Sequence, residues 1–253
     1  MGQRCWGISD GSNQEALALL PNQLESARRI FAGCFLFSDL VEGESRSLGM
    51  RLHLKHFASG KTIFRMGDAG ETMMAVLSGT IKVSVSSQDG NEIILAILHP
   101  NDIIGEIAIL DGRERTADAT ALTDAHLAIL DRRDVIAFFD AHPRMWARIV
   151  DVLCRRLRAT NEHFADVALL PLSKRLAKAL IRLASNGAQG GTSFRDIAMS
   201  QAELGKVVNA SRENVNKLLA DWKGKGIVSI RRGVVKIADA EGLEELAESR
   251  DLS

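Results

Sequence analysis

The chain has 253 residues and a formal net charge of zero, and 46% of its residues are apolar and 25% charged, as in an ordinary folded protein with room for two domains. No window approaches the run of about 18 uncharged apolar residues that a transmembrane helix needs, and the N-terminus carries no apolar secretion signal. We therefore expect a cytoplasmic protein that does not enter a membrane.

Residues 1–34 form a polar lead-in, with one helix predicted over 22–32. From 53 to 130, turn residues separate short apolar runs: LHLKHF, KTIFRM, MMAVLSG, TIKVSVSS, EIILAIL and HLAILD. Short strands with turns about every eight to twelve positions are typical of an antiparallel sandwich or barrel. The QDGN segment at 88–91 predicts a hairpin whose Asp-Gly pair adopts the positive φ values of a primed turn.

A long amphipathic helix is predicted from 143 to 168, because apolar residues recur there at steps of three and four and Pro143 suits a first helical turn. The apolar seam consists of Trp146, Ile149, Leu153, Leu157, Phe164 and Val167, with Thr160 at the remaining position. Heptad-like spacing predicts a dimerising coiled coil, and a helix docked on its own barrel is the alternative.

Pro171 ends that helix, and a further helix is predicted over 172–184. Between 171 and 236 the chain has 13 Lys and Arg against 4 Asp and Glu, a net charge of +9. A basic block in an otherwise neutral chain suggests a polyanionic partner, although a solvated basic face would have the same composition.

Two short helices joined by a tight turn are predicted between 200 and 228. Ser200 and Glu203 form a capping box, Gly205 permits close approach of the second helix, and Ser211 caps that second helix. Its inward face carries Val215, Leu218, Leu219 and Trp222. These features together predict a helix-turn-helix.

The outward side of the second helix carries Arg212, Glu213, Asn216 and Lys217. In a helix-turn-helix this end enters the major groove, where arginine suits guanine and glutamate suits cytosine. The segment GIVSIRRGVVKIA predicts a hairpin with Arg231 and Arg232 at its tip, where they would contact phosphate. We therefore expect double-stranded DNA as the partner of this block.

The segment GEIAILDGRERTADA, residues 105–119, places Glu106 and Arg115 in an apolar, strand-rich neighbourhood. The two residues could form a catalytic pair, an internal salt bridge, or the two sides of a ligand site. The segment alone leaves these three interpretations open.

A barrel, a long helix and a winged helix-turn-helix in this order resemble the Crp–Fnr family of bacterial transcription regulators. The resemblance extends from about residue 35 onward and is most specific in GEIAILDGRERTADATA at 105–121 and SRENVNK at 211–217. The first motif is similar to the phosphate-binding cassette of cyclic-nucleotide-binding domains.

The family resemblance implies an α+β fold: an N-terminal antiparallel β-roll, a long dimerisation helix and a C-terminal winged helix-turn-helix. We place the lead-in at 1–34, the cyclic-nucleotide-binding β-roll at 35–142, the dimerisation helix and hinge at 143–170, and the DNA-binding domain at 171–253. It also implies a homodimer that acts on RNA polymerase, needs no cofactor and responds to cyclic AMP, cyclic GMP or both.

The cassette's chemistry agrees with a cyclic nucleotide ligand. Arg115 can match two phosphate oxygens, a short helix beginning at Glu106 can offer backbone N–H groups, and Glu106 can accept the ribose 2′-hydroxyl. Gly105 removes a Cβ where the ligand approaches. The predicted ligand site comprises Gly105, Glu106, Ile107, Ala108, Arg115, Thr116, Ala117, Thr160 and Asn161.

Three of these residues bear on the choice of base. By the resemblance, Thr160 of one subunit and Asn161 of the other contact the purine, and the amide of Asn161 suits either base. The alternative for Thr160 is a polar residue that sets the register of the helix. Thr116 resembles a threonine that favours guanine in cyclic-GMP-binding relatives.

The predicted DNA contacts are Ser200, Gln201, Ser211, Arg212, Glu213, Asn216, Lys217, Arg231 and Arg232. One departure from the family pattern precedes the cassette, where the usual Gly-Asp is Asn101-Asp102. Asparagine tolerates the left-handed conformation, so we expect this turn to form.

There are two alternatives to a cyclic-nucleotide-controlled regulator. A redox or haem-based gas sensor on the same scaffold would show clustered cysteines or paired histidines, whereas Cys5, Cys34 and Cys154 are widely separated and are expected to be unpaired thiols. An enzyme that hydrolyses the nucleotide would need several metal ligands at one site. We find no such motif and expect neither a catalytic residue nor a metal site.

Overall fold

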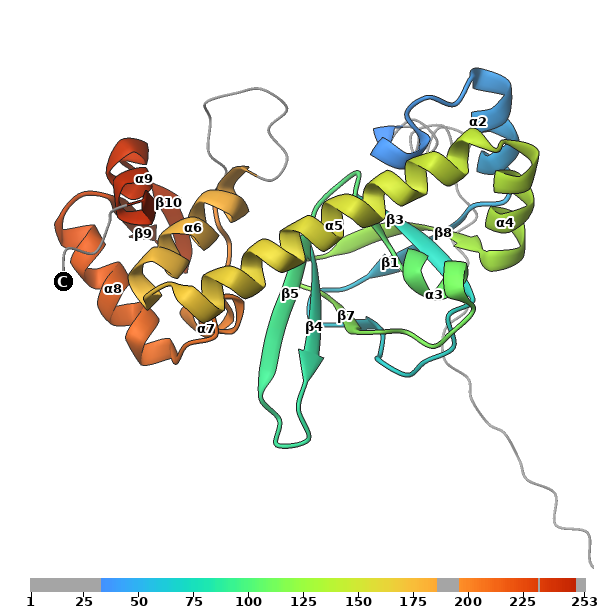
Figure 1. The fold of residues 1–253 in the computed structure, drawn as a ribbon. Helices are drawn as coiled ribbons and strands as arrows, with labels where there is room; N and C mark the ends of the chain where they lie inside the picture. The colour runs from blue at the N-terminus through green and yellow to red at the C-terminus, as the bar shows by residue number, and fades with distance from the viewer. Residues whose placement is uncertain (1–32, 186–195, 232, 249–253) are drawn as a thin grey trace, which may run out of the picture.

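The computed structural model describes residues 33–185, 196–231 and 233–248 (Figure 1). The helix predicted over 22–32 lies outside these ranges, as do Cys5 and Arg232.

The N-terminal part is a β-roll of two four-stranded antiparallel sheets. The first sheet has the order β1 (His53–Phe57), β8 (Ala125–Asp131), β3 (Thr72–Ser78) and β6 (Ile103–Ile104). The second has the order β2 (Thr62–Phe64), β7 (Asp118–Ala121), β4 (Ile81–Ser86) and β5 (Glu92–Leu98).

The helices of this part are η1 (Phe35–Phe37), α2 (Glu42–Gly49), α3 (Glu106–Asp111), α4 (Arg132–Ala141) and the long α5 (Arg144–Leu169). After Pro171 come α6 (Leu172–Ser185), α7 (Gln201–Val208), α8 (Arg212–Gly224), the two-stranded wing β9 (Val228–Arg231) and β10 (Val234–Ile237), and α9 (Ala240–Glu248). The structure thus has the predicted order of a β-roll, a long helix and a winged helix-turn-helix.

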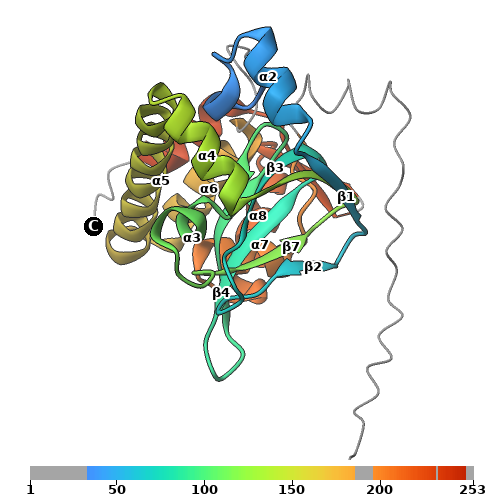
Figure 2. The same ribbon diagram turned by 90° about the vertical axis from the view of Figure 1, so that its right-hand side faces the viewer.

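Three apolar cores hold these parts together. Val76, Ile81 and Leu127 belong to the core inside the β-roll. A second core packs one sheet against the surrounding helices, which cover one side of the roll in Figure 2. The third core belongs to the C-terminal part, which extends from α6 to α9, and it includes Ile94 and Ile97 of β5.

The predicted hairpin at 88–91 forms, but its turn type was predicted wrongly. Five residues, 87–91, separate β4 from β5, and of the Asp-Gly pair only Gly90 has positive φ, at 82°. A primed type I turn needs positive φ at both central residues. By contrast, Asn101 has φ of 78°, as expected for the turn that departs from the family pattern.

The apolar seam of α5 lies partly elsewhere than predicted. Ile149 is 1% exposed, and Trp146 packs edge-on against Phe139 at a ring-centroid distance of 5.2 Å. The first part of the seam therefore belongs to the chain's own core. The exposed face runs through Val150, Cys154, Leu157, Asn161, Phe164 and Ala168.

Figure 1 shows α5 as a single diagonal helix that joins the β-roll to the C-terminal part. The β4–β5 hairpin provides a second connection, because Lys206 Nζ of α7 lies 2.6 Å from Glu92 Oε2 of β5. The two parts are therefore in contact beyond the hinge at Leu170.

Candidate functional site

The cassette begins with a sharp turn at Gly105. Its φ of 84° is left-handed, and a Cβ at this position would lie 2.3 Å from Arg115 Nη1 and 2.8 Å from the Thr72 carbonyl oxygen. Only glycine tolerates both the conformation and the crowding. The guanidinium of Arg115 lies against the space that this glycine leaves, and the approach of a ligand at Gly105 stays a prediction.

Arg115 is held from three sides. Nη1 donates to the Gly105 carbonyl at 3.0 Å, and Nη2 donates to the carbonyl and hydroxyl oxygens of Thr72 at 2.7 and 2.9 Å. The guanidinium also lies over the ring of Phe64, 4.4 Å from its centroid. These contacts together hold the side chain in its position.

Glu106 is 1% exposed and pairs with Arg156 of α5, which also donates to the Ile103 carbonyl. The internal salt bridge between Glu106 and Arg115, one interpretation of the sequence, is therefore not formed. Within the described ranges, Glu106 Oε2 and Arg115 Nε have no hydrogen-bond partner. One buried acceptor and one buried donor thus remain available in the cassette.

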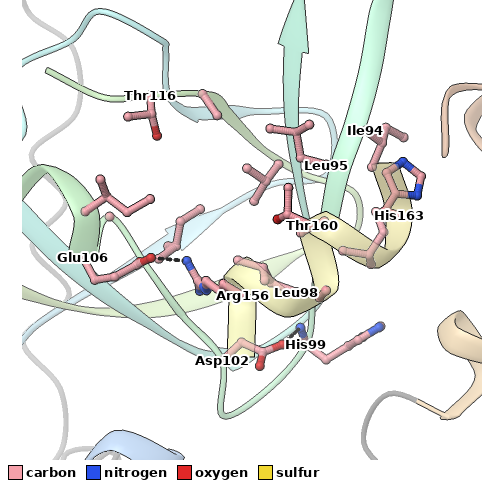
Figure 3. A pocket seen from close by; sticks show the side chains of 18 of the residues that line it. Ile94, Leu95, Leu98, His99, Asp102, Glu106, Thr116, Arg156, Thr160 and His163 are labelled. Carbon is pink, nitrogen blue, oxygen red and sulfur yellow. Dashed lines mark hydrogen bonds and ion pairs between the residues drawn. The ribbon is translucent and has the colours of Figure 1, made fainter. Parts of the chain in front are cut away.

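These groups line a cavity of 630 Å³ between β5, the cassette and α5. Figure 3 shows Glu106 joined to Arg156, with Thr116 and Thr160 on different walls. The volume is in the range of small-molecule sites. A buried cation and a buried acceptor in one cavity suit a ligand that carries an anionic group and a hydroxyl.

The structure brings most of the predicted ligand residues together. The cavity is lined by Gly105, Glu106, Ile107, Ala108, Arg115, Thr116, Ala117 and Thr160. Asn161 is exposed and is not among the lining residues, because it lies on the face of α5 that points away from this cavity.

The sequence analysis missed five residues that shape or hold this cavity: Phe64, Thr72, Arg156, His163 and Arg182. For two of them a signal was available, since Arg156 and His163 lie four residues before and three after Thr160, on one helical face. Thr72 and Phe64 come from distant strands and have no such signal.

The described residues that were predicted to contact DNA lie on α7, on α8, at the N-caps of these two helices and on the wing. Ser200 accepts from the Glu203 N–H and completes the capping box, while Ser211 accepts from the Asn214 N–H at 3.3 Å. Gly205 allows the turn to approach, since a Cβ there would lie 2.6 Å from the Ala210 carbonyl oxygen. The start of the second helix is also close, as expected, since the same Cβ would lie 3.6 Å from the backbone nitrogen of Arg212.

The outward face of α8 is available for contact. Arg212, Glu213, Asn216 and Lys217 are exposed, while Val215, Leu219 and Trp222 are buried beneath them. Ser200, Ser211 and Arg231 are also exposed, and Gln201 is half-buried. Arg232 lies outside the described residues.

The described residues contain no group of three His, Cys, Asp or Glu side chains placed to hold a metal ion. Across the same ranges, no helix combines the length and the apolar character that crossing a bilayer requires.

A ligand cavity with a buried arginine, joined by one helix to a winged helix-turn-helix, defines a DNA-binding regulator with a separate effector domain. Comparisons with known proteins make the class specific. Residues 54–142 match the cyclic nucleotide-binding domain, and residues 174–246 match the Crp-like helix-turn-helix domain.

The chain is 33% identical to the CRP-like cAMP-activated global transcriptional regulator of Mycobacterium tuberculosis, over 86% of this chain and 98% of that one. It is 32% identical to the cyclic AMP receptor protein of Thermus thermophilus, over 76% of this chain and 86% of that one. A solved CRP-family regulator from Thermus thermophilus superposes with a TM-score of 0.65 at 27% identity, covering 77% of this chain and 97% of that chain.

The chain belongs to the Crp–Fnr family of cyclic-nucleotide-binding transcription regulators. Its relatives are regulators and not enzymes, so the catalytic interpretation of Glu106 and Arg115 is set aside. The family and fold predicted from the sequence are confirmed, while the domain bounds and the roles of individual site residues stay predictions.

Proposed function

We propose that the protein is a cytoplasmic homodimer that binds a 3′,5′-cyclic nucleotide and then a palindromic DNA operator, where it acts on RNA polymerase. The observation that carries this proposal is the cavity in which a fixed arginine and a buried carboxylate each keep one unused hydrogen-bonding group. Cyclic AMP is proposed as the activator because relatives at 33% and 32% identity are named for it.

In the proposed complex, Arg115 carries the phosphate and Glu106 Oε2 accepts the ribose 2′-hydroxyl. A guanidinium suits a phosphate because its N–H groups are planar and permanently charged. The carboxylate oxygen is already desolvated, so a ribose lacking the hydroxyl would leave it without a partner. Selection of ribose over deoxyribose follows.

The base would extend toward α5, where Thr160 lines the cavity, while Thr116 lies beside the phosphate arginine. A threonine hydroxyl there can accept from the 2-amino group of guanine, which adenine lacks. We therefore propose that cyclic GMP also binds.

The dimer would form along the exposed face of α5. Val150, Leu157 and Phe164 are 55%, 61% and 74% exposed and recur every seven residues. Apolar side chains at that spacing on a long helix suit a parallel partner helix. Asn161 lies on this same face, and we propose that it reaches the nucleotide of the other subunit.

At the operator, the two recognition helices would enter successive major grooves about 34 Å apart. Arg212 and Glu213 would read bases, while Arg231, together with Arg232 from the sequence alone, would contact phosphates.

The test is calorimetric titration of cyclic AMP into Arg115→Leu, with Arg113→Leu as the matched control. Arg113 lies in the same loop but is exposed and does not line the cavity. Arg115→Leu should lose at least 100-fold in affinity, since charge-assisted hydrogen bonds contribute about 1.5–3 kcal/mol each, while Arg113→Leu stays within twofold. Equal affinity in the two variants would refute the proposed site.

A further inference from the structure

Residues of the DNA-reading part, which extends from α6 to α9, also line the proposed nucleotide cavity. Ala179, Arg182 and Leu183 of α6 and Val207 of α7 line it, together with Ile94 and Ile97 of β5. A ligand anchored at Arg115 therefore has the reading domain at its other end.

Three residues mark the length of the cavity along α5. Arg156 pairs with Glu106 at the ribose end, Thr160 follows one turn later, and His163 lies beyond it, all on one helical face (Figure 3). Seven residues of helix rise about 10 Å. This is about the length of a purine nucleoside, so the base edge of a ligand held at the cassette would lie near His163.

Near His163, Arg182 contacts both this histidine and Asp166, which lies close to the end of α5. Its Nη1 lies 3.2 Å from Asp166 Oδ2, and its Nη2 lies 3.4 Å from His163 Nδ1. Asp166 also accepts from Lys178 Nζ at 2.8 Å and is 7% exposed, three residues before the end of α5. Arg182, which belongs to the DNA-reading part, therefore contacts both the cavity and the end of α5.

The contact with Arg182 determines the tautomer of His163. A guanidinium can only donate, so Nδ1 must be the acceptor and the ring proton must be on Nε2. Burial lowers the pKa of His163, and the charge of Arg182 lowers it further. The imidazole is then neutral and has one donor, Nε2–H, in addition to the donors of Arg182.

We propose that Arg182 and His163 form the base-recognition end of the cavity, so that a residue of the DNA-reading domain contacts the bound purine directly. The inference rests on the proposed function, because it needs a cyclic nucleotide in this cavity. It adds a way in which ligand binding is coupled to the position of the DNA-reading part. Bound ligand favours the orientation of α6 that places Arg182 against the base, and this orientation in turn favours ligand binding.

This arrangement discriminates between the two purines. Guanine presents two acceptors, N7 and O6, on the edge where adenine presents the N7 acceptor and the 6-amino donor. Arg182 and the Nε2–H group of His163 offer only donors, and donors complement both guanine atoms but only one adenine atom. Arg182 should therefore contribute more to the binding of cyclic GMP than of cyclic AMP.

The experiment is calorimetric titration of both nucleotides into full-length wild type, Arg182→Gln and Lys178→Gln. Lys178 is the matched control, because it lies one turn earlier on α6 and binds the same Asp166 but does not line the cavity. We expect Arg182→Gln to weaken cyclic GMP at least tenfold and cyclic AMP distinctly less, with Lys178→Gln within twofold for both. His163→Asn should reproduce the direction of the Arg182→Gln effect.

Equal losses for both nucleotides in Arg182→Gln, or losses equal to those of Lys178→Gln, would overturn the inference and leave Arg182 as a hinge residue only. Thermal melting of each variant shows whether it folds. If Arg182→Gln does not fold, the His163→Asn variant provides the test. A wild-type protein that binds neither nucleotide would refute the proposed function itself. A wild type that binds, with an unchanged ratio in the variants, would refute only this inference.

Discussion

Arg115 is 5% exposed, and the cost of burying its charge is offset by hydrogen bonds to backbone and by the ring of Phe64. Burial lowers the pKa of Arg115, and the nearby carboxylates Glu106, Asp68 and Glu71 act in the opposite direction. An arginine stays protonated even so. The cassette therefore presents a buried cation that is held by several contacts.

Sequence reasoning found the residues of the cassette but not those that hold them. Glu106 and Arg115 were predicted because they lie in one motif. Thr72 and Arg156 were not, because Thr72 is 43 positions from Arg115 and Arg156 is 50 positions from Glu106. Such contacts depend on how the sheets and α5 pack, which a single local pattern does not encode.

At the residue scale, Thr116→Ala should weaken the binding of cyclic GMP more than the binding of cyclic AMP. The hydroxyl is proposed to accept from the guanine 2-amino group, and one hydrogen bond contributes about 0.5–1.5 kcal/mol, or roughly two- to tenfold in affinity. Cyclic AMP serves as the internal control and should change by less than twofold. Competition binding measures both ligands, and parallel losses for both would contradict this role of Thr116.

At the scale of elements, α5 shows that an apolar repeat predicts a helix more reliably than it predicts the surface against which the helix packs. The steps of three and four gave the helix correctly, 144–169 against the predicted 143–168. They did not say which apolar residues face a second chain. Trp146 and Ile149 instead fill the chain's own core, because α4 places Phe139 beside them.

The β4–β5 hairpin was predicted as a hairpin, but its contact with α7 was not. Glu92 of β5 accepts from Lys206 of α7 and also pairs with Lys82 of β4. Burial alone would raise the pKa of Glu92, but hydrogen bonds from Lys206, Lys82 and Ser84 outweigh it and lower the pKa to about 2.

That lowered pKa predicts a pH-dependent contribution to stability. A carboxyl whose folded pKa lies below its ordinary 4.5 stabilises the fold above pH 4.5 and loses this effect as the pH falls toward about 2. At pH 7, Glu92→Gln should lower the free energy of unfolding by about 1–3 kcal/mol. The difference from wild type should shrink below pH 4.5.

Thermal melting of both proteins from pH 7 to pH 3 measures that difference. Asp221→Asn is the control, because Asp221 and Lys225 form an exposed pair on α8 that should contribute less than about 1 kcal/mol. A difference between wild type and Glu92→Gln that is independent of pH would show that Glu92 acts through packing and not through its charge.

At the scale of the whole molecule, the chain is neutral but its charge is unevenly distributed along the sequence. The segment from 171 to 236 carries a net charge of +9 and contains the helix-turn-helix, so the cationic surface lies where DNA is proposed to bind. The effector cavity lies against this same part through Arg182, Leu183 and Val207. The proposed ligand site is therefore in direct contact with the part of the chain that is proposed to bind DNA, in addition to the connection through α5.

The family and the order of domains could be predicted from the sequence because both cassette and helix-turn-helix are local motifs. The contact between the β-roll and the DNA-reading part could not, since it joins residues more than one hundred positions apart, such as Glu92 and Lys206. The shared cavity that results from this contact was likewise beyond the reach of local patterns.

The central claim is that a cyclic nucleotide controls DNA binding by this protein. The most direct measurement is fluorescence anisotropy of the full-length protein on a palindromic duplex, first selected from a random pool in the presence of cyclic AMP and titrated at one fixed salt concentration. We expect cyclic AMP to raise the affinity of the wild-type protein for the duplex at least tenfold and to leave the affinity of Arg115→Leu unchanged. Equal affinity of wild type for the duplex with and without cyclic AMP would contradict it.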